Sequence, residues 1–155
     1  SARPPSAPRG GGDHRLSGYR RIRWIGPCLA TPEAGPHPRL AEAYGRFPVV
    51  VSLEVVEHLY APRVFVRTLF DLVEPSGTAI ISTPYHGYWK NLALALSGRL
   101  DDHFTALWDH GHIKFWSIDT LTQLLQEAGF QAITFRRVGR VPALAKSMIA
   151  VVRKP

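Results

Sequence analysis

The chain has 155 residues, which is enough for one domain and too short for two domains with separate cores. Hydrophobic residues make up 45% and charged residues 20%, a composition that fits a globular protein and excludes disorder over the whole length. No apolar run reaches the roughly 20 residues that cross a bilayer, and the N-terminus lacks a signal-peptide pattern. The single cysteine, Cys28, excludes an intramolecular disulfide and favours a reducing, cytoplasmic setting.

The positive charge is concentrated in the first quarter of the chain. The formal net charge is +7, and residues 1–40 contribute a balance of +5, from seven arginines against Asp13 and Glu33. A basic segment can bind nucleic acid or anionic lipid. Because no recognition motif accompanies these arginines, a solvated arm is the favoured interpretation and nucleic acid is an unlikely partner.

Residues 1–45 form a Pro/Gly/Arg-rich arm that we expect to be irregular. Residues 1–40 hold seven of the 13 prolines, which interrupt helices and remove hydrogen-bond donors from strands. Within this arm only Tyr19–Ile25 has the loose alternation of a possible strand.

From about residue 46 the sequence predicts alternating strands and helices. Pro48–Leu53 is a continuous apolar run, typical of a parallel strand buried on both faces. Ala61–Val73 has apolar residues at helical spacing, Glu74–Gly77 has the composition of a turn, and Thr78–Thr83 reads as a second short buried strand. This part of the chain therefore begins as a strand–helix–strand unit.

The remaining residues predict two helices and a closing pair of strands. Tyr88–Ser97 favours a short helix, and residues 99–116 are irregular and rich in aromatic residues and histidine. Ser117 is a helix cap before a leucine-rich helix, and strands are expected over Phe130–Val138 and Ser147–Arg153. The order indicates an α/β fold, a doubly wound sheet with a terminal antiparallel pair.

Three segments occur in an order that is shared with a known family. They are Val49–Leu59 (VVVSLEVVEHL), the EPSG turn followed by TAIISTP, and SIDTLTQLLQEAGF. Together they resemble the C-terminal half of class I S-adenosyl-L-methionine-dependent methyltransferases, and most nearly the ubiquinone-biosynthesis O-methyltransferase-like proteins. The resemblance covers residues 46–155 and implies part of a Rossmann-like class I methyltransferase fold.

The sequence departs from that family in its first strands. The family carries a D-x-G-x-G loop that lets the backbone approach the cofactor. This chain has no such motif, and its glycine run, Gly10–Gly12, follows no predicted strand. We therefore expect residues 46–155 to be the C-terminal part of a methyltransferase domain, preceded by an arm, residues 1–45, that is truncated or non-native.

Glu54, Glu57 and His58 are the first candidate site. If the strand ends at Leu53, they lie at the sheet edge where open α/β folds bind ligands, and one helical turn would place them on one face. Two carboxylates and an imidazole can hold a divalent cation that polarises a hydroxyl, or His58 can act as a general base. The plainer alternative is a helix N-terminus with two acids that favour its dipole.

The resemblance assigns further roles to the same strand end. It implies magnesium (Mg2+) at Glu54, Glu57 and His58, and contact between Leu53 and the cofactor. We extend the expected cofactor contacts to Ser52 and Glu54, the neighbours of Leu53 in the sequence.

A second candidate site combines the strand end at Tyr85 with the histidine-rich loop. In the family this loop lies over the cofactor cleft, which favours a pocket for the methyl acceptor. A zinc site and an ordinary hydrogen-bonded loop stay open as alternatives. The residues expected to line the acceptor pocket are Tyr85, His86, Trp108, His110 and His112.

The resemblance implies methyl transfer from S-adenosyl-L-methionine, most simply to an oxygen of a small or lipid-like acceptor. The fragment could also be inactive. The alternative is a non-catalytic remnant that acts as a binding or assembly module through the exposed edge of Pro48–Leu53. The sequence leaves the acceptor, the metal requirement and the oligomeric state open.

Overall fold

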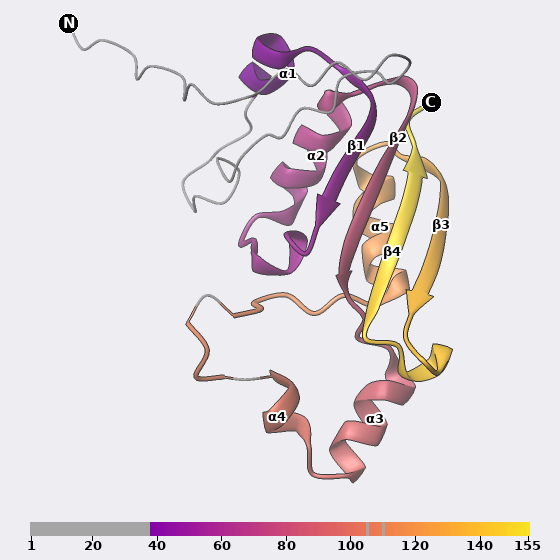
Figure 1. Ribbon diagram of the computed structural model, residues 1–155. Helices are drawn as coiled ribbons and strands as arrows, with labels where there is room; N and C mark the ends of the chain where they lie inside the picture. Colours follow the sequence, from indigo (N-terminus) through magenta and orange to yellow (C-terminus); the bar gives the residue numbers. More distant parts are fainter. Residues whose placement is uncertain (1–37, 105, 110) are drawn as a thin grey trace, which may run out of the picture.

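The computed structural model describes residues 38–104, 106–109 and 111–155 and shows an α/β fold on one sheet (Figure 1). The strands are β1 (Phe47–Leu53), β2 (Val73–Pro84), β3 (Gln131–Val138) and β4 (Ser147–Arg153). The helices are α1 (Pro38–Tyr44), η1 (Val56–His58), α2 (Pro62–Leu72), α3 (Tyr88–Leu96), α4 (Leu100–Phe104), α5 (Ile118–Glu127) and η2 (Pro142–Leu144). The expectations for residues 1–37, including the possible strand at Tyr19–Ile25, lie outside the described residues.

The four strands lie in the order β1-β2-β4-β3. β1 and β2 run parallel, with Val51 opposite Ile80, and α2 connects them. β4 is antiparallel to both of its neighbours, with Val151 opposite Ile80 on β2 and opposite Thr134 on β3. This topology confirms the predicted strand–helix–strand unit and the closing antiparallel pair.

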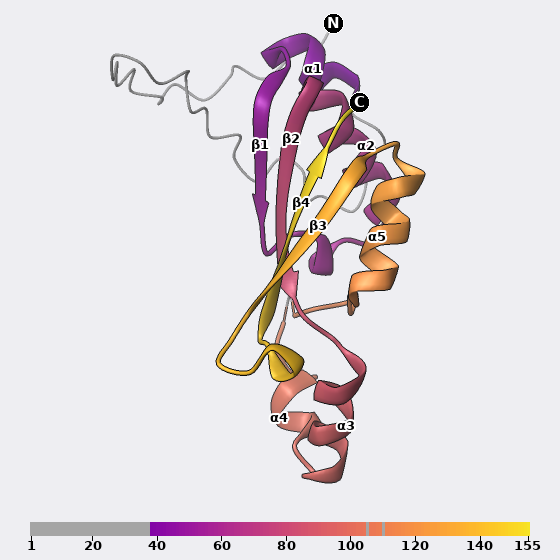
Figure 2. The ribbon, with the colours of Figure 1, turned by 90° about the vertical axis from the view of Figure 1, so that its right-hand side faces the viewer.

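Helices α2 and α5 lie on the same side of the sheet (Figure 2). α2 begins at Pro62, whose fixed φ suits a first helical turn, and α5 begins after Ser117, which forms a capping box with Thr120. Both helices direct their apolar side chains at the sheet, and an ion pair of 2.6 Å between Arg63 and Glu127 joins them at the surface. The buried core includes Phe65, Val66, Leu69, Ile81, Leu121, Leu125, Phe130, Met148 and Val152.

The expectation that the first strand is buried on both faces is wrong. Val49, Val51 and Leu53 are 52%, 55% and 59% exposed, whereas Ser52 is buried. Among the described strands β1 lies at the edge of the sheet, and successive side chains of a strand point to opposite faces. The helices on one side of the sheet therefore leave alternate residues of β1 uncovered.

The predicted turn at Glu74–Gly77 lies inside a strand. β2 runs without interruption from Val73 to Pro84, but its register with β1 shifts, because Phe47 is opposite Val73 and Val49 is opposite Thr78. The extra residues form a bulge in which Ser76 has a φ of +61°. The prediction of a turn is therefore wrong, because the same residue types form this bulge within β2.

Beyond the end of β2 the chain forms α3 and α4, which lie past the end of the sheet (Figure 1). α3 ends before Gly98, whose φ of +68° is the left-handed geometry expected after a helix. None of the helices in the described ranges has the length and hydrophobicity required to cross a bilayer.

Candidate functional site

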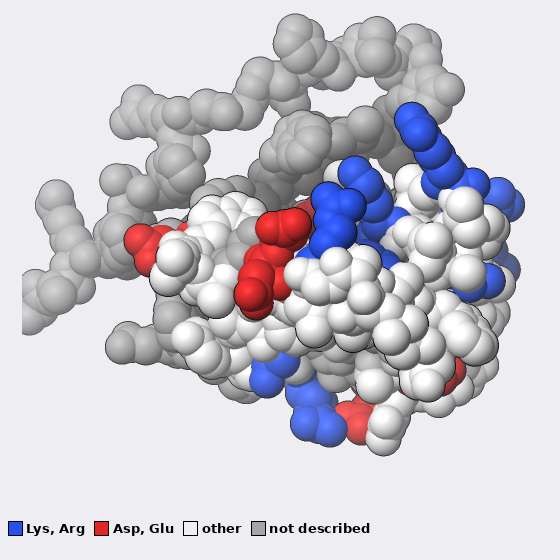
Figure 3. Space-filling view, turned by 90° about the horizontal axis from the view of Figure 1, so that it is seen from below, with Lys and Arg blue, Asp and Glu red and all other residues white. Residues whose placement is uncertain are grey.

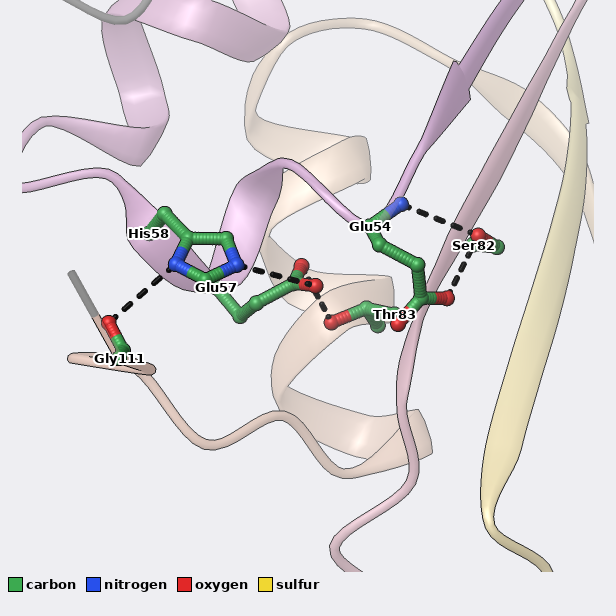
Figure 4. A network of polar contacts seen from close by, with 6 residues as sticks. All are labelled: Glu54, Glu57, His58, Ser82, Thr83 and Gly111. Carbon is green, nitrogen blue, oxygen red and sulfur yellow. Dashed lines mark hydrogen bonds and ion pairs between the residues drawn. The ribbon is translucent and has the colours of Figure 1, made fainter. Parts of the chain in front are cut away.

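The C-terminal ends of the parallel strands β1 and β2 place several polar side chains together (Figure 4). β1 ends at Leu53, and Glu54 then takes a φ of +51° before the short helix η1 begins at Val56. Because Glu54 precedes this helical turn, it does not share a helical face with Glu57 and His58. The edge of the sheet, rather than one helix face, organises the site.

Hydrogen bonds to Ser82 hold Glu54 against the end of β2. Its backbone N–H donates to the carbonyl and the hydroxyl oxygen of Ser82, each at 3.1 Å. In return the Ser82 hydroxyl donates to Oε1 of Glu54 at 2.7 Å. These contacts hold the left-handed backbone of Glu54 and commit one of its carboxylate oxygens to a protein partner.

Glu57 is a buried carboxylate with one free oxygen. Its side chain is only 1% exposed, and the Thr83 hydroxyl donates to Oε2 at 3.0 Å. Oε1 is also buried and has no hydrogen-bond partner among the described residues. Burial raises the pKa of the Glu57 carboxyl above its usual value, and hydrogen bonds, including that from Thr83, offset part of the rise.

His58 presents one ring nitrogen to Glu57. The other nitrogen, Nδ1, lies 3.2 Å from the backbone carbonyl oxygen of Gly111. A carbonyl can only accept, so Nδ1 carries a hydrogen, and in the neutral ring Nε2 carries the lone pair. Nε2 lies 3.9 Å from Oε1 of Glu57. The free atoms of the two side chains thus face each other (Figure 4).

His112 joins this pair from the long loop after α4. The backbone N–H groups of Ile113 and Lys114 both donate to the carbonyl oxygen of Glu57 at 2.9 Å, which ties the loop to η1. The rings of His112 and His58 meet edge to face with centroids 4.9 Å apart. One ligand atom from each of Glu57, His58 and His112 lies within 4.8 Å of the others. Burial, and then the neighbouring His58, lowers the pKa of His112.

His86 belongs to a second group of rings next to α3. It is 8% exposed, its ring stacks on Phe104, and it lies 5.2 Å from the ring of His103. Its Nδ1 has no hydrogen-bond partner among the described residues. Burial, followed by the charge of Lys90, lowers the pKa of His86 to about 4, so His86 is neutral near pH 7.

The other residues expected to bind a ligand differ in exposure. Ser52 is buried, and its hydroxyl has no partner among the described residues, whereas Leu53 is exposed at the strand end. Tyr85 is buried beside Trp116 in an isolated bridge. Trp108 is exposed and lies 5.9 Å from the ring of His112. His110 lies outside the described residues.

Sequence reasoning missed the residues that orient the charged cluster. The sequence places Ser82 and Thr83 only at the end of the predicted strand Thr78–Thr83, but each hydroxyl holds a glutamate. A signal was present, because the C-terminal ends of neighbouring parallel strands meet at one edge of a sheet. The role of Gly111 had no signal, since it depends on its backbone carbonyl.

The surface around the loop end of the molecule has mixed charge. In the view from below, acidic and basic side chains are scattered among a larger uncharged surface (Figure 3). The arginine-rich arm, on which the nucleic-acid hypothesis rested, lies outside the described residues. The face seen in Figure 3 therefore gives that hypothesis no further support.

Relatives of known name are similar to a little over half of this chain. A ubiquinone biosynthesis O-methyltransferase of Ruegeria pomeroyi is 36% identical over 95 residues, which cover 61% of this chain and 38% of the relative. The enzyme of the same name from Azorhizobium caulinodans is 36% identical over 102 residues, covering 63% and 38%. The matched region thus spans less than half the length of these curated relatives.

Solved structures show the same fold at low sequence identity. An O-methyltransferase family protein from Burkholderia thailandensis matches with a TM-score of 0.55 and 20% identity, over 77% of this chain and 33% of that one. A SAM-dependent methyltransferase from Archaeoglobus fulgidus matches with a TM-score of 0.54 and 12% identity, over 76% and 64%. These matches confirm the predicted Rossmann-like class I methyltransferase fold. A family model described as a methyltransferase domain matches residues 14–134, so the chain belongs to the methyltransferase-domain family.

Proposed function

We propose that this chain contributes the acceptor-activating half of an S-adenosyl-L-methionine-dependent methyltransferase that transfers a methyl group to an oxygen of a small or lipid-like acceptor. The observation that carries the proposal is the cluster of Glu57, His58 and His112 at the C-terminal edge of β1 and β2. Open α/β sheets bind their ligands at this edge. The named relatives, which are O-methyltransferases, support the same reaction class.

The end of β1 offers polar and apolar groups to the methyl donor. Ser52 has a buried hydroxyl without a partner among the described residues, and Leu53 presents an exposed apolar side chain one residue further on. Ser52, Leu53 and Glu54 would hold the donor, which supplies an electrophilic methyl group on a sulfonium. Because the sequence has no D-x-G-x-G loop, we expect this chain alone to bind the donor weakly.

The acceptor hydroxyl must lose its proton as the methyl group arrives. His58 is suited to this task, because its Nδ1–H is held by Gly111 and its Nε2 lone pair is available. The buried Glu57, with Oε1 3.9 Å from Nε2, would stabilise the imidazolium that forms. The acceptor pocket would extend from His112 toward Trp108 and the buried rings of Tyr85 and His86.

The magnesium site that the resemblance implied does not fit the donor set. Mg2+ prefers oxygen ligands in near-octahedral geometry. The described atoms that converge are one carboxylate and two imidazoles, and Oε1 of Glu54 is engaged by Ser82. The proposed reaction therefore does not use magnesium at this site.

The proposal is tested by incubating the chain with radiolabelled S-adenosyl-L-methionine and a panel of catechols, simple phenols and prenylated phenols. We expect label in at least one class of phenol, and a loss of about 100-fold or more in Glu57→Ala. Ser97→Ala, at the end of α3, is the matched control and should retain activity. Donor binding without transfer to any of these acceptors would contradict the enzyme proposal.

The second candidate function is an assembly module that uses the open side of β1. β1 pairs only with β2 within the described residues, and alternate side chains of β1 are more than half exposed. An unpaired strand edge is a template for another strand. Sedimentation velocity across a range of concentrations tests it, because a monomer at every concentration would argue against self-pairing through this edge.

A further inference from the structure

We infer that Lys90, His86 and His103 form a binding site for the carboxylate of an aromatic methyl acceptor. The inference rests on the proposed function for the identity of the ligand, whose hydroxyl would lie beside His58 and whose carboxylate would lie beside Lys90. The binding site itself is inferred from a buried ammonium group and two buried ring nitrogens that lack full partners among the described residues.

The first support is the burial of Lys90 on a helix that is mostly exposed. On α3, Lys90 is 7% exposed, whereas the preceding aromatic residues Tyr88 and Trp89 are 73% and 66% exposed. A lysine is seldom buried unless its charge is paired, because the ammonium group loses its water. The helix thus buries its charge and exposes its aromatic rings, which is the reverse of what hydrophobicity alone favours.

Protein partners satisfy only part of this ammonium group. Nζ of Lys90 donates to the backbone carbonyl oxygen of Tyr85 at 2.9 Å, which uses one of its three N–H groups. Within residues 38–104, 106–109 and 111–155, no carboxylate lies at ion-pair distance from Lys90, and Asp102 on α4 pairs with Arg99 instead. A buried charge without a counter-ion is unfavourable. An anionic ligand would supply that counter-ion.

The second support is a pair of histidines beside Lys90. Nδ1 of His86 and Nε2 of His103 are buried, and neither has a hydrogen-bond partner in the part of the chain that the structure describes. The two rings lie 5.2 Å apart, although one follows β2 and the other belongs to α4. A neutral imidazole carries its hydrogen on either nitrogen, so each of these atoms can donate to an anion. Burial lowers both pKa values, and the basic neighbours Lys90 and His112 lower them further.

Aromatic rings form the walls of this site. The ring of Phe104 stacks on that of His86 with centroids 5.8 Å apart, and the ring of Phe115 meets both edge to face at 4.9 Å. The buried indole N–H of Trp116 also has no partner among the described residues. Flat apolar surfaces beside unpaired polar groups fit a ligand that joins an aromatic ring to a polar group. An aromatic carboxylate has both parts.

The site is continuous with the cluster that is proposed to activate the acceptor. The ring of His112 meets that of His58 with centroids 4.9 Å apart. His112 is also close enough to His86 and His103 to lower their pKa values. One acceptor would therefore reach from Nε2 of His58, past His112, to Lys90. A ring that carries a hydroxyl and a carboxylate on different carbons offers both groups in this way.

The test is titration of the isotopically labelled full chain with catechol and with protocatechuate, which is catechol with a carboxylate on its ring, followed by NMR without methyl donor. We expect protocatechuate to bind at least about 10-fold more tightly, because charge-assisted hydrogen bonds form only with the carboxylate. Lys90→Met keeps the apolar part of the side chain and removes the charge. It should reduce the preference for protocatechuate to about twofold or less.

Lys146→Met is the matched control. Lys146 is an exposed lysine close enough to Lys90 to lower its pKa, and its replacement changes the net charge equally. The preference for protocatechuate should stay within about twofold of that of the unmodified chain. His103→Phe keeps a ring beside His86 and removes the buried nitrogen, so it should lower the preference by about fivefold. It provides the test if circular dichroism shows that Lys90→Met does not fold.

Three outcomes would overturn the inference. They are equal binding of the two probes, a preference that persists in Lys90→Met and in His103→Phe, and an equal loss of preference in Lys146→Met. Equal weakening of both probes in Lys90→Met would also overturn it, because Lys90 would then serve only to join α3 to Tyr85. Inorganic phosphate and benzoate are added as competitors. Displacement of protocatechuate by phosphate but not by benzoate would contradict a carboxylate site.

The inference and the proposed function fail in different ways. Methyl transfer to catechol, without any selective binding of protocatechuate, would refute the carboxylate site and leave the proposed function intact. Selective binding of protocatechuate that depends on Lys90, without methyl transfer to any acceptor, would do the reverse.

Discussion

At the scale of single residues, Thr83 determines which oxygen of Glu57 is free. Its hydroxyl donates to Oε2 at 3.0 Å, and both side chains are buried. Thr83→Val preserves the shape of the side chain and removes the donor. We expect a loss of about 1–3 kcal/mol in the free energy of unfolding, because a second carboxylate oxygen then lacks a partner. Urea denaturation with a chelator present measures this change.

The matched control for that substitution is Thr134→Val. The hydroxyl of Thr134 donates to the carbonyl oxygen of Val151 at 3.3 Å on an exposed part of β3. Its loss should change the unfolding free energy by less than about 0.5 kcal/mol. Equal losses of unfolding free energy in the two variants would show that the hydrogen bond from Thr83 to Glu57 contributes no more to stability than an exposed one.

The lowered pKa of His86 predicts how the stability of the fold depends on pH. Burial, together with the nearby Lys90, His103 and His112, lowers its pKa to about 4, below the value of about 6.5 in an unfolded chain. Between these two values the unfolded state binds the proton and the folded state does not, so stability falls as the pH falls. We expect His86 to account for a loss of about 2 kcal/mol between pH 8 and pH 5.

Thermal or urea denaturation of His86→Phe at both pH values tests this expectation. Phenylalanine keeps the contacts with Phe104 and Phe115 and cannot titrate. The variant should lose less stability than the unmodified chain between pH 8 and pH 5. Burial also lowers the pKa of His103 and of His112, so some dependence should persist. Identical slopes in the two proteins would contradict the assignment.

The sequence could indicate part of the charged site at this scale. Glu57 and His58 follow a strongly predicted strand, and ligands gather at the ends of such strands. The sequence could not associate His112 with them, because that association depends on backbone hydrogen bonds from a distant loop to Glu57. Nor could it separate Glu54 from Glu57, which required the left-handed backbone of Glu54 and the alternation of Ser82 and Thr83. The metal and catalytic roles of these residues stay predictions.

At the scale of elements, α5 depends on its N-terminal cap. The Ser117 hydroxyl accepts from the backbone N–H of Thr120 at 3.2 Å, and the Thr120 side chain accepts from the backbone N–H of Ser117 at 3.0 Å. Ser117→Ala should lower the unfolding free energy by about 1 kcal/mol. Ser97→Ala, which removes a hydroxyl at the exposed end of α3, should have a smaller effect. A larger loss of unfolding free energy in Ser97→Ala than in Ser117→Ala would contradict the role of the cap.

The positions of most helices and strands could be predicted from local sequence patterns. What packs against each of them could not. Proline, leucine spacing and the serine cap placed α2 and α5 within a residue or two, because these signals act within the helix itself. The exposure of β1 was misjudged, because an apolar strand reads the same at the edge of a sheet and at its centre. The bulge in β2 was misread as a turn, since both use the same residue types.

At the scale of the whole molecule, the exposed side of β1 is where assembly would occur. Val51→Lys places a charge at the centre of the edge strand, which is a common way to prevent strand pairing. The change should leave the unfolding free energy within about 0.5 kcal/mol, because Val51 is mostly exposed. If the chain self-associates at high concentration, sedimentation velocity should show less association in this variant. Unchanged association would exclude this edge as the contact.

The most direct test of the proposed site is NMR titration of the isotopically labelled chain with S-adenosylhomocysteine at millimolar concentration, where weak binding is still visible. We predict saturable shifts of the backbone amides from Ser52 to His58 and from Ser82 to Tyr85, at the C-terminal ends of β1 and β2. Amides of Arg153 and Lys154, which pair with Thr78 and Gly77 at the opposite end of β2, should shift little. Shifts confined to the β3–β4 pair, or no shifts at all, would contradict a methyl-donor site at this edge of the sheet.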